Sequence, residues 1–488
     1  MDDVPRPSTT AHLRVVPLLL TAALAGGATA CSAGGNPGEW VVPPTVPCPE
    51  PAAPTDLEVT CHRIEVDGAS LAMAVLHAED PTGPPVLHLH GGPGGRAVAD
   101  RHQWLAPRLP LLAHHDVILV DQRGGGFSSP SMDCLEVDSS TTPEPALYRA
   151  CRDRLDAAGV DRSSVTVARL ANDLVTVRRA LSISRWHLHG ASYGTRVALE
   201  LLRTDRDAVA SAVLDSAVPP DVPTHDDLPG GVVDAVAALG RWCAVSARSC
   251  PADIGQRLGT VLGRLADEPA TVTVRSGETL RVDDGTFLRL ATDVLAGPVP
   301  SGPATAATAV EAAATSLAEA VALLMDATTA SGHFEGRAVG DPVAEGAQLS
   351  VECADEVPDN DFTEPADNAL PPTWEDRVAA AVRERWMDVR TLCALWDVEP
   401  SSPTTRRAVR SDVPVLVLAG LLDPVTPVDW AHHLVQESGD LADAVLVTSE
   451  SWSHVPSMSD TCAADLVARF LRDGTRPEAG SVACPEAE

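Results

Sequence analysis

Short apolar runs alternate with amphipathic helical stretches along this 488-residue chain, and this alternation constrains the fold more than any other feature. Helical spacing of apolar residues is clearest at 170–181, 195–202 and 463–472. Strands that alternate with helices predict an α/β fold with a mostly parallel sheet and helices on both of its faces. The strand-like runs lie at residues 86–90, 117–120, 186–189, 212–215, 413–418 and 444–447.

The alternation is interrupted in the middle of the chain. It stops near residue 220, and the following stretch contains Ala-rich helical segments such as 303–328 and few strand-like runs. No period of 20–50 residues repeats, which disfavours solenoids and propellers. We therefore expect a core built from two halves, residues 55–220 and 373–488, with residues 221–372 inserted between them as a helical lid.

The amino terminus predicts export. Residues 15–30 form an apolar run rich in small residues, and this run is too short to span a membrane. We interpret residues 1–30 as a signal peptide and the Gly/Pro-rich residues 31–54 as a tether. The sequence ATAC, which ends at Cys31, resembles a bacterial lipobox in which the cysteine carries lipid. The alternative is ordinary cleavage before an unmodified Cys31. We expect a cell-envelope lipoprotein or a secreted protein.

The charge balance excludes several classes of protein. Lys+Arg total 36 and Asp+Glu total 68, which gives a formal net charge of −32, and the sequence contains no lysine. Nucleic-acid binders and proteins that attach to anionic lipid through charge both need clustered basic residues, so we expect neither partner. The lack of lysine also excludes a Schiff-base lysine and a P-loop lysine.

Eleven cysteines in an exported chain predict disulfide bonds. If Cys31 carries lipid, the other ten fall into sequential pairs, and nearest-neighbour pairing is our interpretation. A zinc site is the alternative, but no CxxC pair and no Cys/His cluster with ligand spacing occurs, so we expect no metal. The predicted pairs are Cys48–Cys61, Cys134–Cys151, Cys243–Cys250, Cys353–Cys393 and Cys462–Cys484.

The strongest chemical signal is the motif Gly190-x-Ser192-x-Gly194 between a predicted strand and a predicted helix. In that context the serine lies on a sharp turn that exposes its hydroxyl above the edge of the sheet. The flanking glycines are needed because side chains would clash in so tight a bend. We predict that Ser192 is a nucleophile; a plain tight turn is the alternative interpretation.

A serine hydroxyl needs a base and an acid that orients the base. In this strand–turn–helix arrangement the partners follow in the order Ser, acid, His. Asp423 follows the run at 413–418, and His454 follows the run at 444–447, 31 residues later. We predict that they are the acid and the base, with Asp429 as a second candidate acid. The alternatives are a turn residue at Asp423 and a surface histidine at His454.

Acyl transfer also needs donors for the oxyanion of the tetrahedral intermediate. One donor should be the backbone N–H of Tyr193, directly after the nucleophile. The other should come from the loop HGGPGG at residues 90–95, where we expect Gly92, with Gly91 as the alternative. Phosphate binding by this loop is disfavoured because no lysine and no GxGxxG motif follows. No metal or organic cofactor is implied.

Six motifs in order carry a family resemblance: HGGPGG, DQRGGGFSSP, HGASYGT, LAGLLDPVTP, SWSHVP and the tail DGTRPEAGSVACP. Together they resemble secreted α/β-hydrolase-fold serine peptidases of the prolyl iminopeptidase and tripeptidyl-aminopeptidase family, over residues 40–218 and 345–485. The C-terminal third is most similar to the tripeptidyl-aminopeptidase branch. The resemblance implies the α/β-hydrolase fold, the three catalytic roles given above, and a supporting role for residues 121–124.

The chain departs from this family beside the predicted base. The family usually has glycine around the histidine, whereas here Ser453 precedes His454 and Val455 follows it. A β-branched valine disfavours the left-handed backbone that glycine allows. We therefore expect an altered loop geometry at this position.

The resemblance also implies a carboxylate that binds the free amino terminus of a peptide substrate. The acidic stretch at residues 351–356 is similar to the one that follows the lid in this family. Glu352 is the first candidate, and Asp355 and Glu356 are the next. The alternative interpretations are solvated surface, because acidic residues are abundant throughout the chain, and an ammonium site made by carboxylates of the lid instead.

Three functions are consistent with the sequence. The first is an exported serine exopeptidase that releases short peptides or a residue from free peptide N-termini through an acyl-enzyme. The second uses the same residues as an esterase or amidase on small esters, lactones or amides, since a fold and a triad do not fix the substrate. The third is an inactive envelope lipoprotein that kept the fold, for which the SWSHVP loop is the supporting feature.

Overall fold

A ten-stranded sheet forms the centre of the computed structural model, which describes residues 41–49, 57–105, 110–138, 144–246, 250–273, 277, 279–299, 301–330, 343–362, 373–437 and 441–482. The strand order is β1-β2-β3-β5-β4-β6-β7-β10-β11-β12. The strands are β1 (Thr45–Val46), β2 (Val59–Val66), β3 (Ala69–Leu76), β4 (Val86–Leu89), β5 (Val117–Val120), β6 (Trp186–Ala191), β7 (Val209–Asp215), β10 (Val415–Gly420), β11 (Ala444–Ser449) and β12 (Gly480–Ser481).

Most of the sheet is parallel, which confirms the predicted fold class. All pairs from β5 to β12 are parallel, and all six strand-like runs predicted from the sequence form strands. The antiparallel pairs lie at the amino-terminal edge, where β1, β2 and β3 were not predicted. β2 reads VTCHRIEV, and its polar residues interrupt the apolar run from which a strand would be predicted.

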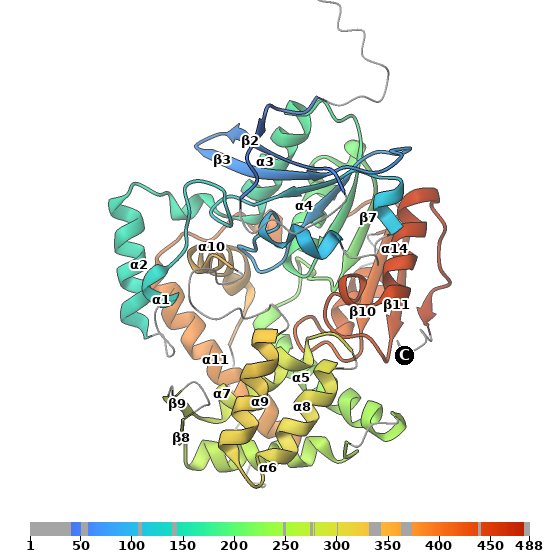
Figure 1. Cartoon of the computed structure of the whole chain (residues 1–488). Coiled ribbons are helices and arrows are strands. Elements are labelled where there is room, and N and C mark those ends of the chain that lie inside the picture. Colours follow the sequence, from blue (N-terminus) through green and yellow to red (C-terminus); the bar gives the residue numbers. More distant parts are fainter. Residues whose placement is uncertain are drawn as a thin grey trace, which may run out of the picture. The chain divides into compact units, whose positions relative to one another are not determined.

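Helices cover both faces of the sheet because its side chains alternate between the faces. Leu71, Met73 and Val75 of β3 lie in one apolar cluster with α3 and α4, and Ala72 and Ala74 lie in another with α14. Figure 1 shows these helices on the two sides of the strands. The helices of the core are α1 (Leu135–Asp138), α2 (Pro145–Ala157), α3 (Val167–Ala180), α4 (Tyr193–Thr204), α10 (Glu345–Val351), α12 (Val428–His432), α13 (Pro456–Ser459) and α14 (Thr461–Asp473).

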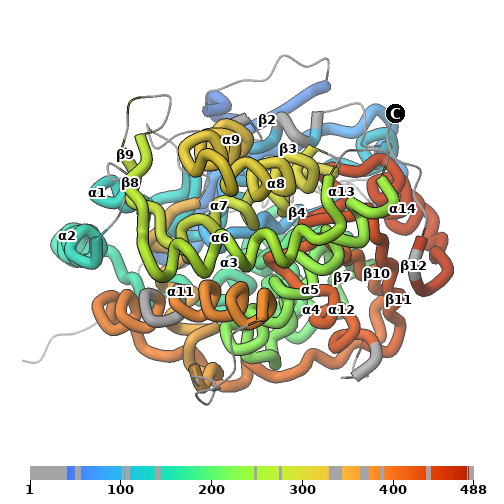
Figure 2. The backbone as a smooth tube through the Cα atoms, turned by 90° about the horizontal axis from the view of Figure 1, so that it is seen from below, coloured from blue at the N-terminus to red at the C-terminus, as the bar shows by residue number. Residues whose placement is uncertain are grey.

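A third apolar cluster belongs to the segment between β7 and β10. Its residues come from five helices, from the hairpin formed by β8 (Ala270–Thr273) and β9 (Thr279–Val282), and from the first half of α11 (Trp374–Trp396). Figure 2 shows α5, α6 and α11 lying side by side in this region. The five helices are α5 (Thr224–Val245), α6 (Ile254–Asp267), α7 (Asp284–Leu295), α8 (Ser301–Ala312) and α9 (Leu317–Ala330).

Contacts between the predicted lid and the core include those made by α11 and by Leu422. The boundaries 220 and 372 stay a prediction. α11 begins in the lid cluster and ends at Trp396 in the core cluster. Leu422, one residue before Asp423, is fully buried among the lid side chains. Of the helices in the described part of the chain, α5 is long and apolar enough to cross a membrane, and half of its apolar window is buried inside the molecule.

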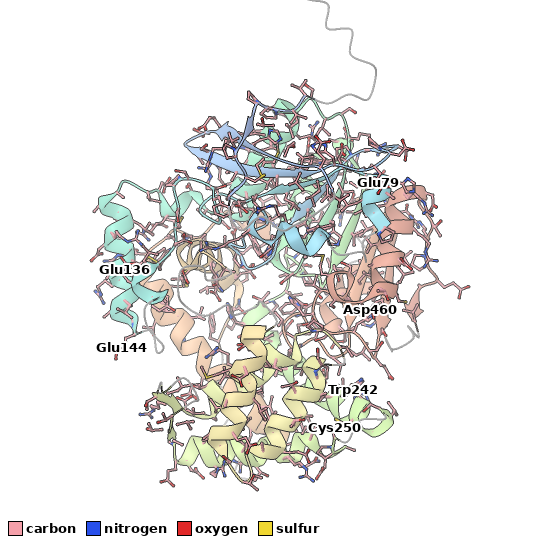
Figure 3. The ribbon with its side chains drawn as sticks, in the orientation of Figure 1. Glu79, Glu136, Glu144, Trp242, Cys250 and Asp460 are labelled. Atoms are coloured by element: carbon pink, nitrogen blue, oxygen red, sulfur yellow. A yellow bond between two sulfur atoms is a disulfide. The ribbon has the colours of Figure 1, made fainter. Side chains whose placement is uncertain are left out.

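Four of the five predicted disulfides form. They are Cys48–Cys61, Cys134–Cys151, Cys243–Cys250 and Cys353–Cys393, with Cα–Cα distances of 5.1–5.3 Å. Figure 3 labels Cys250 and the neighbouring Trp242 in the helical lid. Cys484, the predicted partner of Cys462, lies outside the described residues, as do Cys31 and the whole predicted signal peptide. Of the predicted tether, residues 41–49 are described.

Candidate active site

Ser192 lies between β6 and α4 in a backbone conformation that serine rarely adopts. Its φ and ψ are 54° and −127°, and it is the last residue before the first turn of α4. The backbone around it has no space for side chains, because a Cβ on Gly194 would lie 1.9 Å from Leu89 O. The Ser192 N–H donates to Asp215 O at the end of β7, at 2.9 Å. This is the strained strand–turn–helix geometry expected of an exposed nucleophile.

His454 and Asp423 meet at the same edge of the sheet. His454 Nδ1 lies 2.8 Å from Asp423 Oδ2, and the exposed fractions of the two side chains are 13% and 0%. Burial alone would lower the pKa of His454, but the charge of Asp423 and its hydrogen bond raise that pKa above its ordinary value. Burial opposes ionisation of Asp423 as well, yet the His454 interaction holds the Asp423 pKa below its usual range.

Asp423 is held by its own loop as well as by the histidine. Its Oδ1 accepts the N–H groups of Val425 and Thr426 at 2.8 and 3.0 Å, and its Oδ2 accepts the Thr426 hydroxyl at 2.5 Å. Asp429, the second candidate acid, lies on α12. Its negative charge repels the carboxylates of Asp227 and Asp234. The geometry therefore brings His454 together with Asp423 and not with Asp429.

The altered loop geometry expected from Val455 is not seen, because this residue keeps the left-handed backbone that a glycine would allow. Val455 has φ 51° and ψ 62°, a left-handed conformation that is costly for a β-branched residue. Ser453 is buried, and its hydroxyl donates to Leu295 O at the end of α7 and to Leu422 O, at 2.7 and 3.2 Å. The serine that replaces the family's glycine thus connects the histidine loop to the lid and to the acid loop.

Of the predicted oxyanion donors, Tyr193 and the alternative Gly91 lie beside Ser192. Tyr193 is the first residue of α4 and is 4% exposed. Gly91 touches the serine, because a Cβ on Gly91 would lie only 2.9 Å from Ser192 Cβ. Gly92 has φ 114°, and a Cβ there would lie 3.0 Å from the N atom of Gly95. The choice between Gly91 and Gly92 stays a prediction.

Residues 121–124 make hydrogen bonds to the predicted oxyanion loop and to segments next to it. The carboxylate of Asp121, fully buried, accepts the N–H groups of Val98 and Phe127, each at 2.8 Å. Burial raises the pKa of Asp121 to about 6. Gln122 Nε2 donates to His90 O at 3.3 Å, which ties this turn to the start of the HGGPGG loop. These contacts agree with a supporting role.

The three candidate amine-binding carboxylates have different surroundings. Asp355 is fully buried, its Oδ2 accepts the Val167 N–H at 2.8 Å, and burial raises its pKa to about 6. Glu356 pairs with Arg196 at 2.8 Å, and its side chain is 12% exposed. Glu352, at 22%, is the most exposed of the three. All three lie on one π-helical turn, Glu352–Glu356, a feature frequent at functional sites.

Glu352 lies near the imidazole ring of His225, which stacks on a phenylalanine ring. His225 Nε2 of α5 lies 3.6 Å from Glu352 Oε1, and the His225 ring stacks on Phe362 with centroids 5.6 Å apart. The guanidinium carbon of Arg390, on α11, lies 5.3 Å from the centroid of the Phe362 ring. Among the described residues, no group of three or more His, Cys, Asp or Glu side chains could hold a metal ion.

Two hydroxyl residues that contact the acid were not predicted. Thr426 lies three residues after Asp423, and Ser216 follows directly after the predicted strand at 212–215. Ser216 donates to Asp423 across 207 positions of sequence. The one available signal was its place at the carboxyl end of a strand, where α/β folds gather their functional residues.

Comparisons with known proteins agree with this fold. Residues 84–238 match a family described as alpha/beta hydrolase fold, and residues 377–484 match one described as TAP-like protein. Over 135 residues the chain is 32% identical to a probable proline iminopeptidase of Streptomyces coelicolor, covering 28% of this chain and 33% of that protein. A proline iminopeptidase of Arabidopsis thaliana is 31% identical over 134 residues, covering 28% and 27%.

The chain spans about a third or less of the length of these curated relatives. Among solved structures, a proline iminopeptidase of Mycobacterium smegmatis aligns over 85% of this chain and 98% of its own, with a TM-score of 0.42 and 17% identity. The sheet topology and the family matches give this chain the α/β-hydrolase fold. Its carboxyl-terminal part resembles TAP-like proteins, as its motifs indicated.

Proposed function

We propose that this protein is an exported serine hydrolase that cleaves amide bonds near free peptide N-termini. The observation that carries the proposal is the His454–Asp423 pair, 2.8 Å apart, on loops at the sheet edge where the strained turn presents Ser192. The similarity to proline iminopeptidases supports a peptide as the substrate.

The proposed reaction has two steps. Ser192 Oγ attacks the scissile carbonyl carbon while His454 takes the hydroxyl proton, and Asp423 stabilises the imidazolium that forms. Backbone N–H groups of Tyr193 and Gly92 hold the oxyanion. His454 then gives its proton to the leaving amine, and the acyl group remains on Ser192. In the second step His454 takes a proton from water, which attacks the acyl-enzyme, and His454 then returns that proton to Ser192 Oγ as the acyl–oxygen bond breaks and the product leaves.

A free amino terminus would be bound by Glu352. Glu352 is the most exposed of the three carboxylates, with 22% of its side chain accessible, so it is the candidate best placed to meet a ligand.

Export rests on the sequence and on the disulfides. Bonds of this kind persist in oxidising compartments and are rare in the cytosol, and four of them form among the described residues. Cleavage of the signal peptide before Cys31, with lipid attached to that cysteine, would tether the enzyme to a membrane. The intact mass of the mature protein tests both steps.

Matched peptide amides test the substrate class. We expect a fluorogenic tripeptide amide with a free N-terminus to be hydrolysed and its N-acetylated twin to be hydrolysed at least about 10-fold more slowly. Ser192→Ala is the blank. Glu352→Gln should raise KM for the free peptide and leave the acetylated one unchanged. Equal rates on both peptides, together with fast hydrolysis of p-nitrophenyl esters, would favour an esterase or amidase instead.

A further inference from the structure

Two neighbouring residues at the end of β7, Asp215 and Ser216, contact all three loops of the proposed active site. Both are fully buried. Neither belongs to the predicted triad, and neither touches the predicted amine-binding turn in the hydrogen bonds of the described residues. Their position in the sheet is fixed, because the Ser216 N–H donates to Leu418 O of β10 at 2.9 Å.

Ser216 connects the acid loop to the base loop. Its hydroxyl donates to Asp423 Oδ2 at 2.9 Å and accepts the Val455 N–H at 2.9 Å. Val455 is the residue directly after His454, so one oxygen atom lies between the acid and the segment that carries the base. Donation to a charged carboxylate is among the stronger hydrogen bonds in proteins.

Asp215 connects the turn that carries the nucleophile to the segment that follows the base. Its carbonyl oxygen accepts the Ser192 N–H at 2.9 Å, and its carboxylate Oδ2 accepts the Ser457 N–H at 2.9 Å. The two N–H groups come from the turn at the nucleophile and from the segment three residues after His454. Together with the Ser216 contacts, this gives four hydrogen bonds from two adjacent residues to the three loops.

The Val455 contact explains how this chain tolerates valine beside the histidine. A left-handed β-branched residue is disfavoured, so it persists only when its surroundings hold it. The Ser216 hydroxyl accepts the Val455 N–H in that conformation, and without this acceptor the residue would relax toward extended backbone. Such a change would turn the preceding His454 away from Asp423.

We propose that Asp215 and Ser216 are positioning residues, which we call the β7 clamp, and that the Ser216 hydroxyl holds Val455 in the left-handed conformation of the histidine loop. The proposal concerns the same site as the proposed function and rests on it for its kinetic consequences. The clamp touches the acid, the base loop and the nucleophile turn, and it does not touch substrate.

The test uses Ser216→Gly, because glycine adopts φ 59° without strain and removes the hydroxyl together with the Cβ atom that carries it. Ser211→Ala is the matched control: it removes a buried hydroxyl from the other end of the same strand, where the partner is His187. We expect Ser216→Gly to lower kcat by about 10- to 100-fold with little change in KM, and the control to stay within about twofold.

A second variant, Val455→Gly, tests whether glycine at this position compensates for the lost Ser216 hydroxyl. It should change the wild-type kcat by less than about threefold and restore part of the activity of Ser216→Gly, because glycine holds the left-handed conformation without the hydroxyl. Equal effects of Val455→Gly in both backgrounds would overturn the proposal. So would a Ser216→Gly enzyme as active as the Ser211→Ala control.

Hydrogen exchange separates this proposal from the proposed function. The Val455 amide should be protected in the wild-type protein and exchange faster in Ser216→Gly, whether or not any peptide is hydrolysed. A wild-type protein that is inert on every substrate but shows this pattern would end the peptidase proposal and keep the clamp. Rapid exchange of Val455 in the wild-type protein would overturn the clamp, even if the variant fails to fold.

Discussion

At the scale of single residues, opposing effects on His454 decide whether it can act as a base. Burial favours the neutral imidazole, whereas Asp423 favours the protonated form, and the pKa of His454 is raised above its ordinary value of about 6.5. A general base must be neutral. Activity should therefore rise with pH through this raised pKa, and the acid limb of kcat/KM should lie above pH ~6.5.

Asp423→Asn reverses this balance. Without the carboxylate charge, burial dominates, so the pKa of His454 falls and the acid limb moves to lower pH. The imidazole also loses the partner that fixes its tautomer, and kcat should fall by about 10⁴-fold, as in other triads. A pH–rate profile measures both effects. Asp429→Asn is the control, and an equal loss from Asp429→Asn would contradict the assignment of the acid.

The sequence identifies some site residues and hides others for a physical reason. Ser192, Asp423 and His454 each follow an apolar run, so their positions at the carboxyl edge could be predicted. Ser216 also follows such a run, but a serine there has no distinctive chemistry until its partner Asp423 is placed beside it. Long-range hydroxyl contacts of this kind leave no local pattern.

At the scale of elements, the turn between β6 and α4 depends on close backbone contact. A Cβ on Gly194 would lie 1.9 Å from Leu89 O, a backbone atom that can move only with β4. Gly194→Ala should therefore lower the free energy of unfolding by about 3 kcal/mol or more. Gly230→Ala is the control, because nothing lies within 4 Å of its Cβ and alanine favours the helix.

We expect Gly230→Ala to raise the free energy of unfolding by up to about 1 kcal/mol. Urea denaturation of both variants measures the difference. Similar stabilities for Gly194→Ala and Gly230→Ala would mean that β4 gives way easily and that the turn is not rigid.

The strands of the parallel sheet could be predicted because each is buried on both faces and reads as an apolar run. β2 and the lid hairpin could not, whereas β3 reads ASLAMAVL, an apolar run that the sequence prediction missed. β2 alternates polar and buried residues, and β9 reads TLRV with two exposed positions in four. The π-helical turn Glu352–Glu356 also has no sequence signature, although it carries all three acidic candidates.

At the scale of the whole molecule, the lid and the catalytic loops share contacts. Leu422 is buried in the lid cluster, and Ser453 donates to Leu295 O of α7. Residues of the inserted segment therefore contact both the acid loop and the base loop. The apolar spacing of the sequence indicated a helical insertion but gave no sign that it would contact these loops.

The Cys353–Cys393 bond fixes the acidic turn to α11 and closes 40 residues of chain. The double variant Cys353→Ser/Cys393→Ser should lower the free energy of unfolding by about 4 kcal/mol and raise KM for free-amine peptides. The control is the loss of Cys243–Cys250, which closes 7 residues and should cost about 2 kcal/mol with KM unchanged. A larger loss from the shorter loop would contradict this account.

The most direct test of the central claim is the mass of the protein after reaction with a fluorophosphonate, followed by peptide mapping. An activated serine attacks phosphorus and expels fluoride, so the account predicts one adduct on Ser192, formed by the wild-type protein and absent from Ser192→Ala. Asp423→Asn should form it far more slowly. An unmodified wild-type protein, or an adduct on another serine, would contradict the account.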